Sequence, residues 1–366
     1  MQITAAITRG TGEPFEITTL ELDDPRAGEV QVKLTATGIC HTDAIVRDQV
    51  YPTPLPAVLG HEGAGVVEKV GEGVTTVAPG DKVVLGFNSC GSCQQCLGGM
   101  PAYCQHFYDY NFSGTRPDGT TALSDGETAV SSHFFGQSSF ASHANVSARS
   151  VVKVDDDAPL ELLGPLGCGL MTGAGSIINS LSVGAGESVA IFGTGAVGSA
   201  AIMAAAAVGA TTIIAIDLVD SRLERAREYG ATHTINSGSE DLTARLAEIT
   251  AEQGVNVALD TTGITAVTRQ AADAVGIKGR VGLVGAPALG DEATFEVGAS
   301  LLKGWSFRTI IEGDAVPQDF IPRLVHLWRN GQFPIEKLIK TYPLDQINQA
   351  FEDSKSGETI KPIVTF

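Results

Sequence analysis

Residues Ser188 to Ala200 read SVAIFGTGAVGSA. An apolar strand-like run leads into a loop with Gly193, Gly195 and Gly198, and an Ala-rich helical run follows. In a G-x-G-x-x-G loop placed this way, the first glycine allows a tight turn and the second lets the backbone approach a pyrophosphate. The third glycine lets the helix pack on the strand, and the helix N-terminus stabilises the phosphate charge. The pattern predicts a dinucleotide-binding unit.

The next strand-like run, Thr212–Asp217, ends in a carboxylate 19 residues after Gly198. A carboxylate at this place accepts hydrogen bonds from the adenosine ribose hydroxyls. It also repels an additional 2′-phosphate, so NAD is favoured over NADP as the cofactor. The alternative is a glycine-rich turn between strand and helix that binds no ligand.

Around this unit, from about Gly164, helix-like and strand-like runs alternate. This order predicts a parallel sheet with helices on both faces, which is the doubly wound α/β class. The predicted elements are a helix at Gly169–Ser180, a strand at Ser188–Phe192, a helix at Ala196–Val208, a strand at Thr212–Asp217, a helix at Ser221–Tyr229 and strands ending at Asp260 and Gly285.

The flanking parts of the chain have a different character. Residues 1 to about 153 are rich in Val, Thr and Gly, and their short alternating runs indicate a compact, mostly β domain. Its strands are expected at Gln31–Ala36, Gly65–Val70 and Lys82–Leu85, and Gln105–Ser132 is expected to be a long loop that shapes subunit contacts. After about Ile311 a helix is predicted at 320–330 and a terminal strand at 360–366.

Composition limits the function classes. The 366 residues carry a formal charge of −18, which argues against nucleic acid as a partner because phosphate binding needs clustered basic charge. The length suggests about two domains. The longest apolar stretch, Gly195–Ala210, falls short of the roughly 20 residues of a membrane span, and no secretory signal is visible at the N-terminus. A cytoplasmic protein with reduced thiols is therefore expected, so its six Cys are metal ligands or core residues.

Four of the cysteines lie close together, in the segment FNSCGSCQQCLGGMPAYC. Cys90, Cys93, Cys96 and Cys104 have the spacing C-x2-C-x2-C-x7-C, which suits four thiolates around one tetrahedral Zn²⁺. An iron–sulfur cluster also uses such runs, but the usual proline after the last Cys is missing. With no ligand position left for water, the pattern predicts a structural zinc site. The alternative is four free or disulfide-bonded cysteines.

The other two cysteines, Cys40 in GICHTD and Cys168 in LGCGL, stand apart, and GHEG at 60–63 lies between them. Alone, each cysteine is more often a small core residue. Together with His61 they would form a site of two thiolates and one imidazole with one open position, an arrangement found in catalytic zinc sites. The spacing by itself does not show that the three residues meet.

These motifs, in this order, resemble the zinc-dependent medium-chain alcohol dehydrogenases, and most of all the aryl-alcohol (benzyl-alcohol) branch. The resemblance covers essentially the whole chain, from GEVQVKLTATGICHTD to IKPIVTF. It implies a GroES-like β-barrel catalytic domain from residues 1–169 and 312–366, with a Rossmann NAD-binding domain from 170–311 inserted between. It also implies a homo-dimer or homo-tetramer.

The resemblance assigns roles by position. Cys40, His61 and Cys168 correspond to the catalytic zinc ligands, Asp43 to the carboxylate that orients the ligand histidine, and Glu62 to a carboxylate that approaches the zinc during ligand exchange. Thr42 corresponds to the hydroxyl that bonds the substrate oxygen. The cofactor contacts implied are His41 and Lys361 at the pyrophosphate, Arg222 beside Asp217 at the ribose, and Thr172 at the nicotinamide. Plainer alternatives are a solvated His41, a turn role for Asp43 and an exposed edge charge at Lys361.

The implied reaction is oxidation of a primary alcohol to its aldehyde. The zinc lowers the pKa of the alcohol, Thr42 passes the proton toward the cofactor ribose, and the cofactor accepts the hydride. Some members of the family have a histidine three residues beyond the relay hydroxyl, where this chain has Ile45. The route by which the proton leaves is therefore open.

The substrate pocket implied by position contains Tyr51, Gly86, Phe134 and Phe135. Because family members often have an aromatic ring at the position of Gly86, the glycine is expected to admit a planar substrate on which Tyr51 and Phe134 stack. Aryl or allylic primary alcohols are favoured; alternatively, these aromatics are only core or rim residues.

Two other functions compete with this prediction. One is oxidation of an anionic thiol adduct of formaldehyde, for which Arg47 and Arg116 are the basic residues expected nearby. The other is a non-catalytic NAD- or zinc-binding sensor, which would be marked by loss of a catalytic ligand, yet Cys40, His61 and Cys168 are all present.

Overall fold

The computed structural model describes all residues from Met1 to Phe366. The chain divides into two compact units. The first contains Met1–Cys168, Val316–Val325 and Ile335–Phe366, and the second contains Gly169–Ala315 and His326–Pro334. The second unit is thus inserted into the first along the chain. The domain boundaries at 169/170 and 311/312 stay a prediction.

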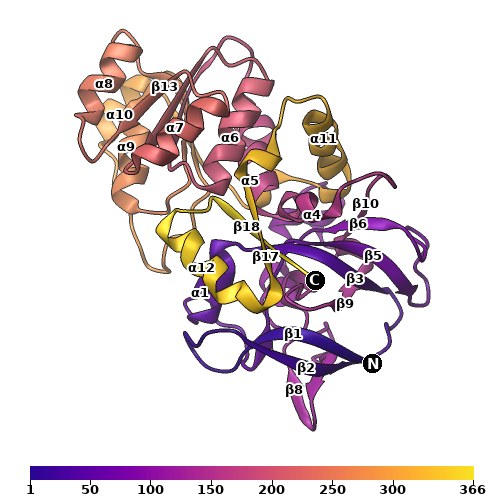
Figure 1. Cartoon of the computed structure of the whole chain (residues 1–366). Helices are drawn as coiled ribbons and strands as arrows, with labels where there is room; N and C mark the ends of the chain where they lie inside the picture. Colours follow the sequence, from indigo (N-terminus) through magenta and orange to yellow (C-terminus); the bar gives the residue numbers. More distant parts are fainter. The chain divides into compact units, whose positions relative to one another are not determined.

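The second unit is built on a six-stranded sheet in which every pair of neighbours is parallel (Figure 1). Its order is β13-β12-β11-β14-β15-β16, so the strand that leads into the glycine loop lies in the interior of the sheet. The strands are β11 (Ser188–Phe192), β12 (Thr212–Asp217), β13 (His233–Asn236), β14 (Val255–Asp260), β15 (Val275–Leu283) and β16 (Ser306–Thr309). The parallel α/β sheet expected from the sequence is confirmed.

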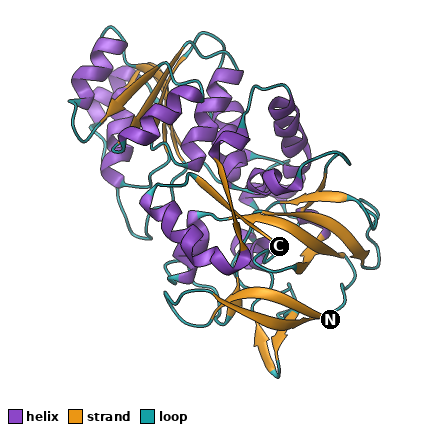
Figure 2. Cartoon of the chain, viewed as in Figure 1, coloured by secondary structure: helices purple, strands orange, loops and turns teal.

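Helices surround this sheet, as the helix and strand colours of Figure 2 show. They are α5 (Gly169–Gly175), α6 (Ala196–Ala207), α7 (Asp220–Glu228), α8 (Leu242–Ile249), α9 (Thr265–Ala274) and α10 (Val297–Lys303). One core cluster joins Phe192, Ile214 and Val281 of the sheet to Ala271 of α9. Most of the small residues of α6 are buried, which explains why the sequence of this helix shows no polar face.

The first unit contains two further sheets. The seven-stranded one has the order β10-β6-β5-β3-β18-β17, with β9 also paired to β3, and the five-stranded one has the order β4-β1-β2-β7-β8. The strands are β1 (Gln2–Thr8), β2 (Glu16–Leu22), β3 (Glu29–Gly38), β4 (Ala57–Val58), β5 (Gly63–Val70), β6 (Lys82–Leu85), β7 (Leu123–Asp125), β8 (Thr128–Val130), β9 (His143–Ser147), β10 (Val151–Lys153), β17 (Ile339–Pro343) and β18 (Lys361–Thr365). This curled, mostly antiparallel arrangement is the predicted near-barrel.

Residues from both ends of the chain build the larger sheet. Strand β18 pairs antiparallel with β3, with Ile363 opposite Gly38, and parallel with β17. Val32, Leu34, Val67 and Leu85 belong to the buried cluster inside this sheet. The C-terminal strand is therefore part of the same compact unit as the N-terminal strands.

The helical segments of the first unit are short, except for two near the C-terminus. They are α1 (His41–Arg47), α2 (Gln94–Leu97), η1 (Pro101–Tyr103), α3 (Phe107–Asn111), η2 (Phe134–Gly136), η3 (Ala148–Ser150), α4 (Leu160–Leu163), η4 (Gly164–Gly167), η7 (Ile335–Leu338), η8 (Leu344–Gln346) and α12 (Ile347–Ser356). Helix α11 (Pro317–Arg329) starts in the first unit and ends in the second.

One local expectation was wrong. The segment 105–132 is not a plain loop, because it contains α3 and the hairpin β7–β8, and β7 pairs with β2. The helix predicted at 169–180 is confirmed over its full length, although α5 continues after Gly175 as the π-helical turn η5 (Ser176–Ser180). None of the helices has both the length and the apolar composition of a membrane span. Only the helices Leu160–Gly167 and Gly169–Ser180 together reach that length and composition, and they are bent by 57° relative to each other.

Candidate functional site

The four cysteines of the loop, Cys90, Cys93, Cys96 and Cys104, form one cluster, which we call the four-cysteine cluster. Their sulfur atoms all lie within 4.8 Å of one another. The Sγ atoms of Cys90 and Cys96 are 3.9 Å apart, and those of Cys93 and Cys104 are 4.0 Å apart. Sulfurs bound to one tetrahedral zinc at about 2.3 Å would be separated by about 3.8 Å. The spacing therefore fits one zinc ion, and none of the six cysteines is in a disulfide.

Backbone amides hold the sulfurs of this cluster. The N–H groups of Ser92 and Cys93 donate to Cys90 Sγ at 3.5 and 3.3 Å, and that of Cys90 donates to Cys104 Sγ at 3.3 Å. Hydrogen bonds from the backbone of Ser92 lower the pKa of the Cys90 thiol to about 5, against the opposing effect of burial. The loop thus favours a thiolate at Cys90, which is the form that binds metal.

The second cluster consists of Cys40, His61 and Cys168, whose ligand atoms also lie within 4.8 Å of one another. Cys40 caps the N-terminus of α1, His61 lies just before β5, and Cys168 follows η4. The pKa of Cys40 lies well below its usual range. The main cause is the hydrogen bond between Cys40 and Cys168, and the charge of His61 adds to it, while burial acts in the opposite direction. The structure therefore brings together three residues that spacing alone could not connect.

The imidazole of His61 is oriented for metal binding. Its Nδ1 lies 2.8 Å from Oδ1 of Asp43, and both side chains are fully buried. Its Nε2 is buried and has no hydrogen-bond partner. Because Asp43 accepts the Nδ1 proton, the lone pair at Nε2 is free for a metal. Burial opposes charge on this ring, but Asp43 and the Cys40 thiolate raise the pKa of His61 well above its usual value, so a metal that binds Nε2 displaces a proton from it.

Asp43 also shapes the backbone on which the ligands lie. Its Oδ2 accepts the N–H of Cys40 at 3.0 Å and its Oδ1 accepts the N–H of Gly60 at 3.1 Å. One carboxylate thus fixes the chain before His61, the ring of His61 and the chain at Cys40. The alternative that Asp43 is only a turn residue does not account for these contacts.

Glu62 and Lys361 form a buried ion pair beside the cluster. Lys361 Nζ donates to the two carboxylate oxygens of Glu62 at 2.9 and 2.8 Å, and Lys361 is only 2% exposed. The alternative of an exposed edge charge at Lys361 is therefore wrong. Burial opposes charge on Lys361, yet Glu62 and Cys40 raise its pKa, while burial raises the pKa of Glu62. Contact of Lys361 with a pyrophosphate stays a prediction.

Thr42 and His41 lie at the start of α1. The hydroxyl of Thr42 lies 3.7 Å from Cys40 Sγ, so it is close to the metal ligands. His41 is exposed, which leaves its predicted cofactor contact and the solvated alternative both open. Ile45, one turn further along the helix, is half-buried.

Aromatic rings form a wall against His61. The ring of Phe135 stacks on the imidazole with centroids 4.5 Å apart and an interplanar angle of 27°, and Phe134 meets it edge-on at 5.3 Å. Phe135 has φ +52°, a left-handed conformation that costs about 1–3 kcal/mol for a residue with a side chain. The backbone strain at Phe135 therefore coincides with the stacking of its ring on His61.

Phe112 connects this wall to Tyr51, a link that the sequence did not indicate. The ring of Phe112 lies 5.2 Å from that of Phe135 and 5.9 Å from that of Phe134. Tyr51 meets Phe112 edge-on at 6.1 Å. Tyr51, Phe134 and Phe135, three of the four residues predicted for the pocket, therefore gather around the ring of Phe112. Phe134 and Phe135 are buried, as the alternative of core residues predicts.

Gly86 does not leave an open space on its Cβ side. A Cβ built at Gly86 would lie 3.2 Å from Cβ of Pro317, so this proline occupies part of the volume that an aromatic side chain would fill. The carbonyl of Gly86 accepts the amide of Gln137 at 3.1 Å, and the same amide donates to the carbonyl of His61 at 3.0 Å. Gln137, which sequence reasoning missed, fixes Gly86 beside the ligand histidine.

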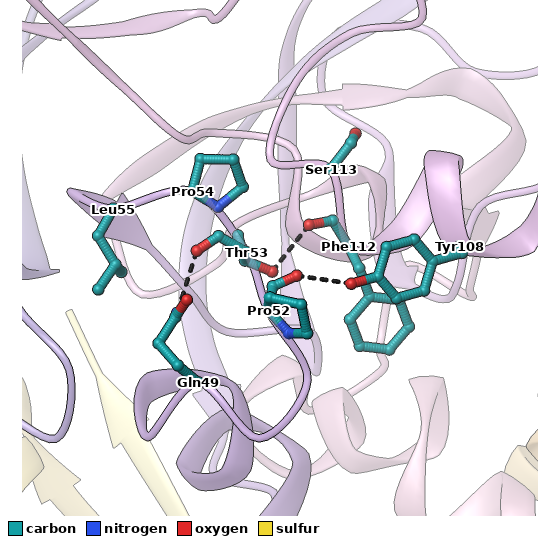
Figure 3. A pocket seen from close by; sticks show the side chains of 8 residues that line it. All are labelled: Gln49, Pro52, Thr53, Pro54, Leu55, Tyr108, Phe112 and Ser113. Carbon is teal, nitrogen blue, oxygen red and sulfur yellow. Dashed lines mark hydrogen bonds between the residues drawn. The ribbon is translucent and has the colours of Figure 1, made fainter. Parts of the chain in front are cut away.

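Phe112 also lines a mostly apolar pocket of about 550 Å³ (Figure 3). Tyr108 donates its hydroxyl proton to the carbonyl of Pro52, and Thr53 donates to the carbonyl of Phe112, both at 2.8 Å. These bonds tie helix α3 to the chain after α1. The pocket is lined by Gln49, Pro52, Thr53, Pro54, Leu55, Tyr108, Phe112 and Ser113.

The glycine loop of the second unit has the geometry that a pyrophosphate requires. Gly193 has φ +86°, so it makes the turn that a side chain would strain. A Cβ on Gly198 would lie 1.9 Å from the carbonyl oxygen of Gly193, which explains the close packing of α6. A Cβ on Gly195 would meet nothing within 4 Å, so a ligand has room to approach the backbone there. The loop fits a dinucleotide.

Three residues predicted to contact the cofactor, Asp217, Arg222 and Thr172, differ in how many of their hydrogen bonds are made within the protein. Asp217 Oδ2 accepts the N–H and the hydroxyl of Thr194 at 2.8 and 2.7 Å, which orients the carboxylate at the end of β12. Arg222 Nε is buried without a hydrogen-bond partner, as expected for a group that awaits a ligand. Thr172, predicted at the nicotinamide, donates to Oε2 of the buried Glu312 at 3.3 Å.

The two arginines that would favour an anionic thiol adduct are engaged elsewhere. Arg116 is buried, and its Nε donates to Glu29 at 2.6 Å. Arg47 pairs with Asp48 at 2.8 Å and its guanidinium lies 5.6 Å from the ring centre of Phe351. Arg116 is thus held inside the protein, and Arg47 is paired with its neighbour in the sequence.

Comparison with known families agrees with both halves of this description. A model of the alcohol dehydrogenase GroES-like domain matches residues 26–156, and a model of the zinc-binding dehydrogenase family matches residues 196–328. The chain belongs to the zinc-dependent medium-chain alcohol dehydrogenase family. As a zinc alcohol dehydrogenase, it has two candidate zinc sites, the four-cysteine cluster and the Cys40–His61–Cys168 cluster.

Individual members of this alcohol dehydrogenase family are similar over the full length. The geraniol dehydrogenase of Castellaniella defragrans is 46% identical over 364 residues, which cover 99% of this chain and 97% of the relative. The crystal structure of an alcohol dehydrogenase zinc-binding domain protein from Burkholderia ambifaria is 55% identical, with TM-score 0.98, and covers 100% and 99%. The benzyl alcohol dehydrogenase structure from Acinetobacter calcoaceticus is 49% identical, with TM-score 0.97 and the same coverage.

Proposed function

We propose that this alcohol dehydrogenase oxidises primary aryl or allylic alcohols to aldehydes with NAD as the hydride acceptor. The observation that carries the proposal is the aromatic wall on the candidate catalytic site, in which Phe135 stacks on His61 and Phe134 lies edge-on. These two rings are 0% and 3% exposed, so they make the surroundings of the ligand histidine apolar, which favours an apolar substrate. The similarity to proteins named benzyl alcohol dehydrogenase and geraniol dehydrogenase supports the same class.

The chain's own residues have separate tasks in this proposal. Cys40, His61 and Cys168 would hold a zinc ion, which when bound supplies Lewis acidity, and a bound nicotinamide supplies the hydride acceptor. Asp43 keeps His61 in the tautomer that leaves Nε2 free. Thr42, close to Cys40, would accept the proton of the alcohol and pass it on. The buried rings of Phe134 and Phe135 would exclude water from the face of His61.

The cofactor choice rests on the second unit. Gly193, Gly195 and Gly198 would lie against the pyrophosphate, with the open side of Gly195 as the point of closest approach. Asp217 would bind the ribose hydroxyls and repel a 2′-phosphate, and Arg222 has a buried nitrogen still to be satisfied. We therefore propose NAD over NADP.

We also propose that the active form is a homo-oligomer. Strand β16 is the outer strand of the six-stranded sheet, and all four of its residues are exposed. On helix α10, Leu301 and Leu302 are at least 80% exposed. An unpaired strand edge beside exposed apolar side chains is typical of a surface that another chain covers.

The test is a panel of alcohols assayed with NAD and with NADP. We expect kcat/KM for benzyl alcohol and for a long allylic alcohol to exceed that for ethanol by at least about tenfold, because each 1.4 kcal/mol of differential binding gives a factor of ten. Equal values for benzyl alcohol and ethanol would reject the aromatic preference. Activity with formaldehyde only after a thiol is added would favour the thiol-adduct function instead.

A further inference from the structure

Glu312 is a buried carboxylate of the second unit that the proposed reaction does not use. It begins the short turn η6 (Glu312–Asp314) and is 8% exposed. All three residues of the turn have positive φ, +51° at Glu312, +64° at Gly313 and +50° at Asp314. Residues with a side chain keep this conformation only where the surroundings hold it, and such strain is common at functional sites. The turn is therefore a candidate for a functional role.

The turn is held against helix α5 and the π-helical turn η5. The carbonyl of Gly313 accepts the side-chain amide of Asn179 at 3.1 Å. A Cβ on Gly175 would lie 2.4 Å from the same carbonyl oxygen, so the two backbones are in direct contact. Thr172 donates its hydroxyl proton to Oε2 of Glu312 at 3.3 Å. These contacts fix the carboxylate beside Thr172.

Helix α5 connects this carboxylate to the glycine loop. A Cβ on Gly173, the neighbour of Thr172, would lie 2.1 Å from the carbonyl oxygen of Val197. Val197 belongs to the first turn of α6, whose N-terminus is the expected place of the pyrophosphate. The pair of Thr172 and Glu312 is therefore one residue along α5 from the contact with the phosphate-binding end of α6.

The order of the strands places Glu312 on the nicotinamide side of the loop. In a sheet of this kind a dinucleotide lies across the carboxyl ends of the strands, on both sides of the glycine loop. Asp217 ends β12 on one side of β11, and β14, β15 and β16 lie on the other side. Glu312 follows the end of β16, which is parallel to its neighbour, by three residues. With the adenosine ribose at Asp217, the nicotinamide would extend toward Glu312.

We propose that Glu312 makes the cofactor site favour the oxidised cofactor, because its carboxylate stabilises the positive charge that the nicotinamide ring carries in NAD and lacks in NADH. The proposal rests on the NAD site of the proposed function and deepens it. In a buried site the attraction between opposite charges is stronger than in water. Hydride transfer removes the charge of the ring, so the carboxylate holds the reduced cofactor less tightly. Glu312 thereby favours release of NADH, a step that often limits turnover.

The experiment compares three ligands by calorimetry in the full-length zinc protein: NAD, NADH and ADP-ribose, which lacks the nicotinamide. Glu312→Gln keeps the shape of the side chain and removes its charge. We expect the ratio of the Kd for NAD to the Kd for NADH to rise about tenfold in this variant. Two unit charges within about 12 Å of each other interact by this much at an effective dielectric constant of about 20. The Kd for ADP-ribose stays unchanged.

Further variants separate the charge from general damage. Glu312→Asp keeps the charge and should keep the ratio close to that of wild type. Glu187→Gln is the matched control, because Glu187 precedes β11 at the opposite edge of the same sheet, where it pairs with Arg280 at 2.6 Å. It should leave all three Kd values unchanged. If Glu312→Gln does not fold, Glu312→Gly takes its place with the same expected ratio, because glycine adopts a positive φ without strain.

Two results would overturn the inference. Equal weakening of all three ligands in Glu312→Gln would mean that the residue supports the site as a whole and does not distinguish the two states of the cofactor. An unchanged ratio would mean that the carboxylate does not act on the nicotinamide. If the wild-type protein binds neither NAD nor NADH, the proposed function fails first, so the two failures are distinguishable.

Discussion

The two metal clusters of the first unit are built in opposite ways. The four-cysteine cluster takes its ligands from residues 90–104 of one loop, and backbone amides hold its sulfurs. The catalytic cluster takes its ligands from residues 40, 61 and 168, and its surroundings are buried side chains. The first arrangement is local in the sequence, whereas the second exists only when the sheet has folded.

The two clusters therefore differ in what keeps their ligands in place. The loop 90–104 has few buried residues, so its order depends on the metal it is suited to hold. The catalytic cluster is preorganised by Asp43, Gln137 and the Glu62–Lys361 pair, each of which bonds to a ligand or its neighbour. We therefore expect changes at the first site to affect stability and changes at the second to affect activity.

The largest effect is expected for Cys168→Ser. Loss of this ligand removes the catalytic metal, and the several kcal/mol of charge stabilisation that a metal supplies correspond to a loss of about 1,000-fold or more in kcat/KM. The melting temperature should change little, because the four-cysteine cluster is untouched. NADH formation, zinc content and thermal unfolding check this. A variant with two zincs and normal activity would show that Cys168 is not a ligand of the zinc on which activity depends.

The converse change is Cys96→Ser in the exposed loop. Without its metal the loop should unfold locally, because it lacks a core of its own. We expect rapid proteolytic cleavage within 88–112 and loss of one zinc, while the remaining zinc still supports alcohol oxidation. Limited proteolysis followed by mass spectrometry locates the cut. Resistance to protease equal to that of wild type would show that the loop does not depend on metal.

A smaller effect is expected for Asp43→Asn, which keeps the shape but not the charge behind His61. Affinity for the catalytic zinc should fall by about 10–100-fold. Asp109→Asn is the matched control, since Asp109 lies 3.7 Å from a histidine ring, that of His106, but both are exposed. It should not change zinc affinity. Competition with a chelator of known affinity measures both variants, and equal affinities would exclude an orienting role for Asp43.

The buried carboxylate of Glu29, which contacts neither metal cluster, provides a third site for comparison. Burial alone would raise the pKa of Glu29, but hydrogen bonds from His133 and Arg116 hold it at about 2. Because the folded pKa is below the unfolded value, the stabilisation is present above about pH 4.3 and is lost as the pH falls toward 2. It amounts to something on the order of 3 kcal/mol.

Glu29→Gln tests this network. The variant should be less stable than wild type to urea at pH 7, and the difference should shrink between pH 5 and pH 3. Its zinc content at pH 7 should match that of wild type, because neither metal cluster contacts Glu29. A difference in unfolding free energy that does not vary with pH would mean that the Glu29 charge is not what stabilises the fold.

The smallest effect is expected for Ile45→His, one helical turn from Thr42. The half-buried isoleucine offers no group to carry a proton away, whereas an imidazole titrates near neutral pH. The pH profile of kcat for alcohol oxidation should shift while zinc content and stability stay the same. An unchanged profile would mean that the proton relay ends elsewhere.

The sequence predicted the local features of the molecule well. The G-x-G-x-x-G loop, the flanking strands and the four-cysteine spacing are each contained in a short segment, so residue order alone specifies them. The catalytic triplet needed family resemblance, because 107 residues separate His61 from Cys168.

The long-range contacts could not be predicted. Phe112 joins Tyr51 to the rings on His61, Pro317 fills the space beside Gly86, and Lys361 turns inward to Glu62. Phe112 and Pro317 carry no signal of their own, and the resemblance assigned Lys361 to the cofactor without indicating its pairing with Glu62. Their roles depend on which strands and helices pack side by side, and that is fixed only by the complete fold.

The central claim is that alcohol oxidation depends on the metal held by Cys40, His61 and Cys168 and not on the metal of the four-cysteine cluster. The most direct measurement is activity plotted against zinc content while the purified enzyme is partly stripped with a chelator and then reloaded. We predict two zincs per chain at the start, activity that follows the occupancy of one of them, and full recovery on reloading. Activity that stays constant as zinc falls from two to none would contradict the account.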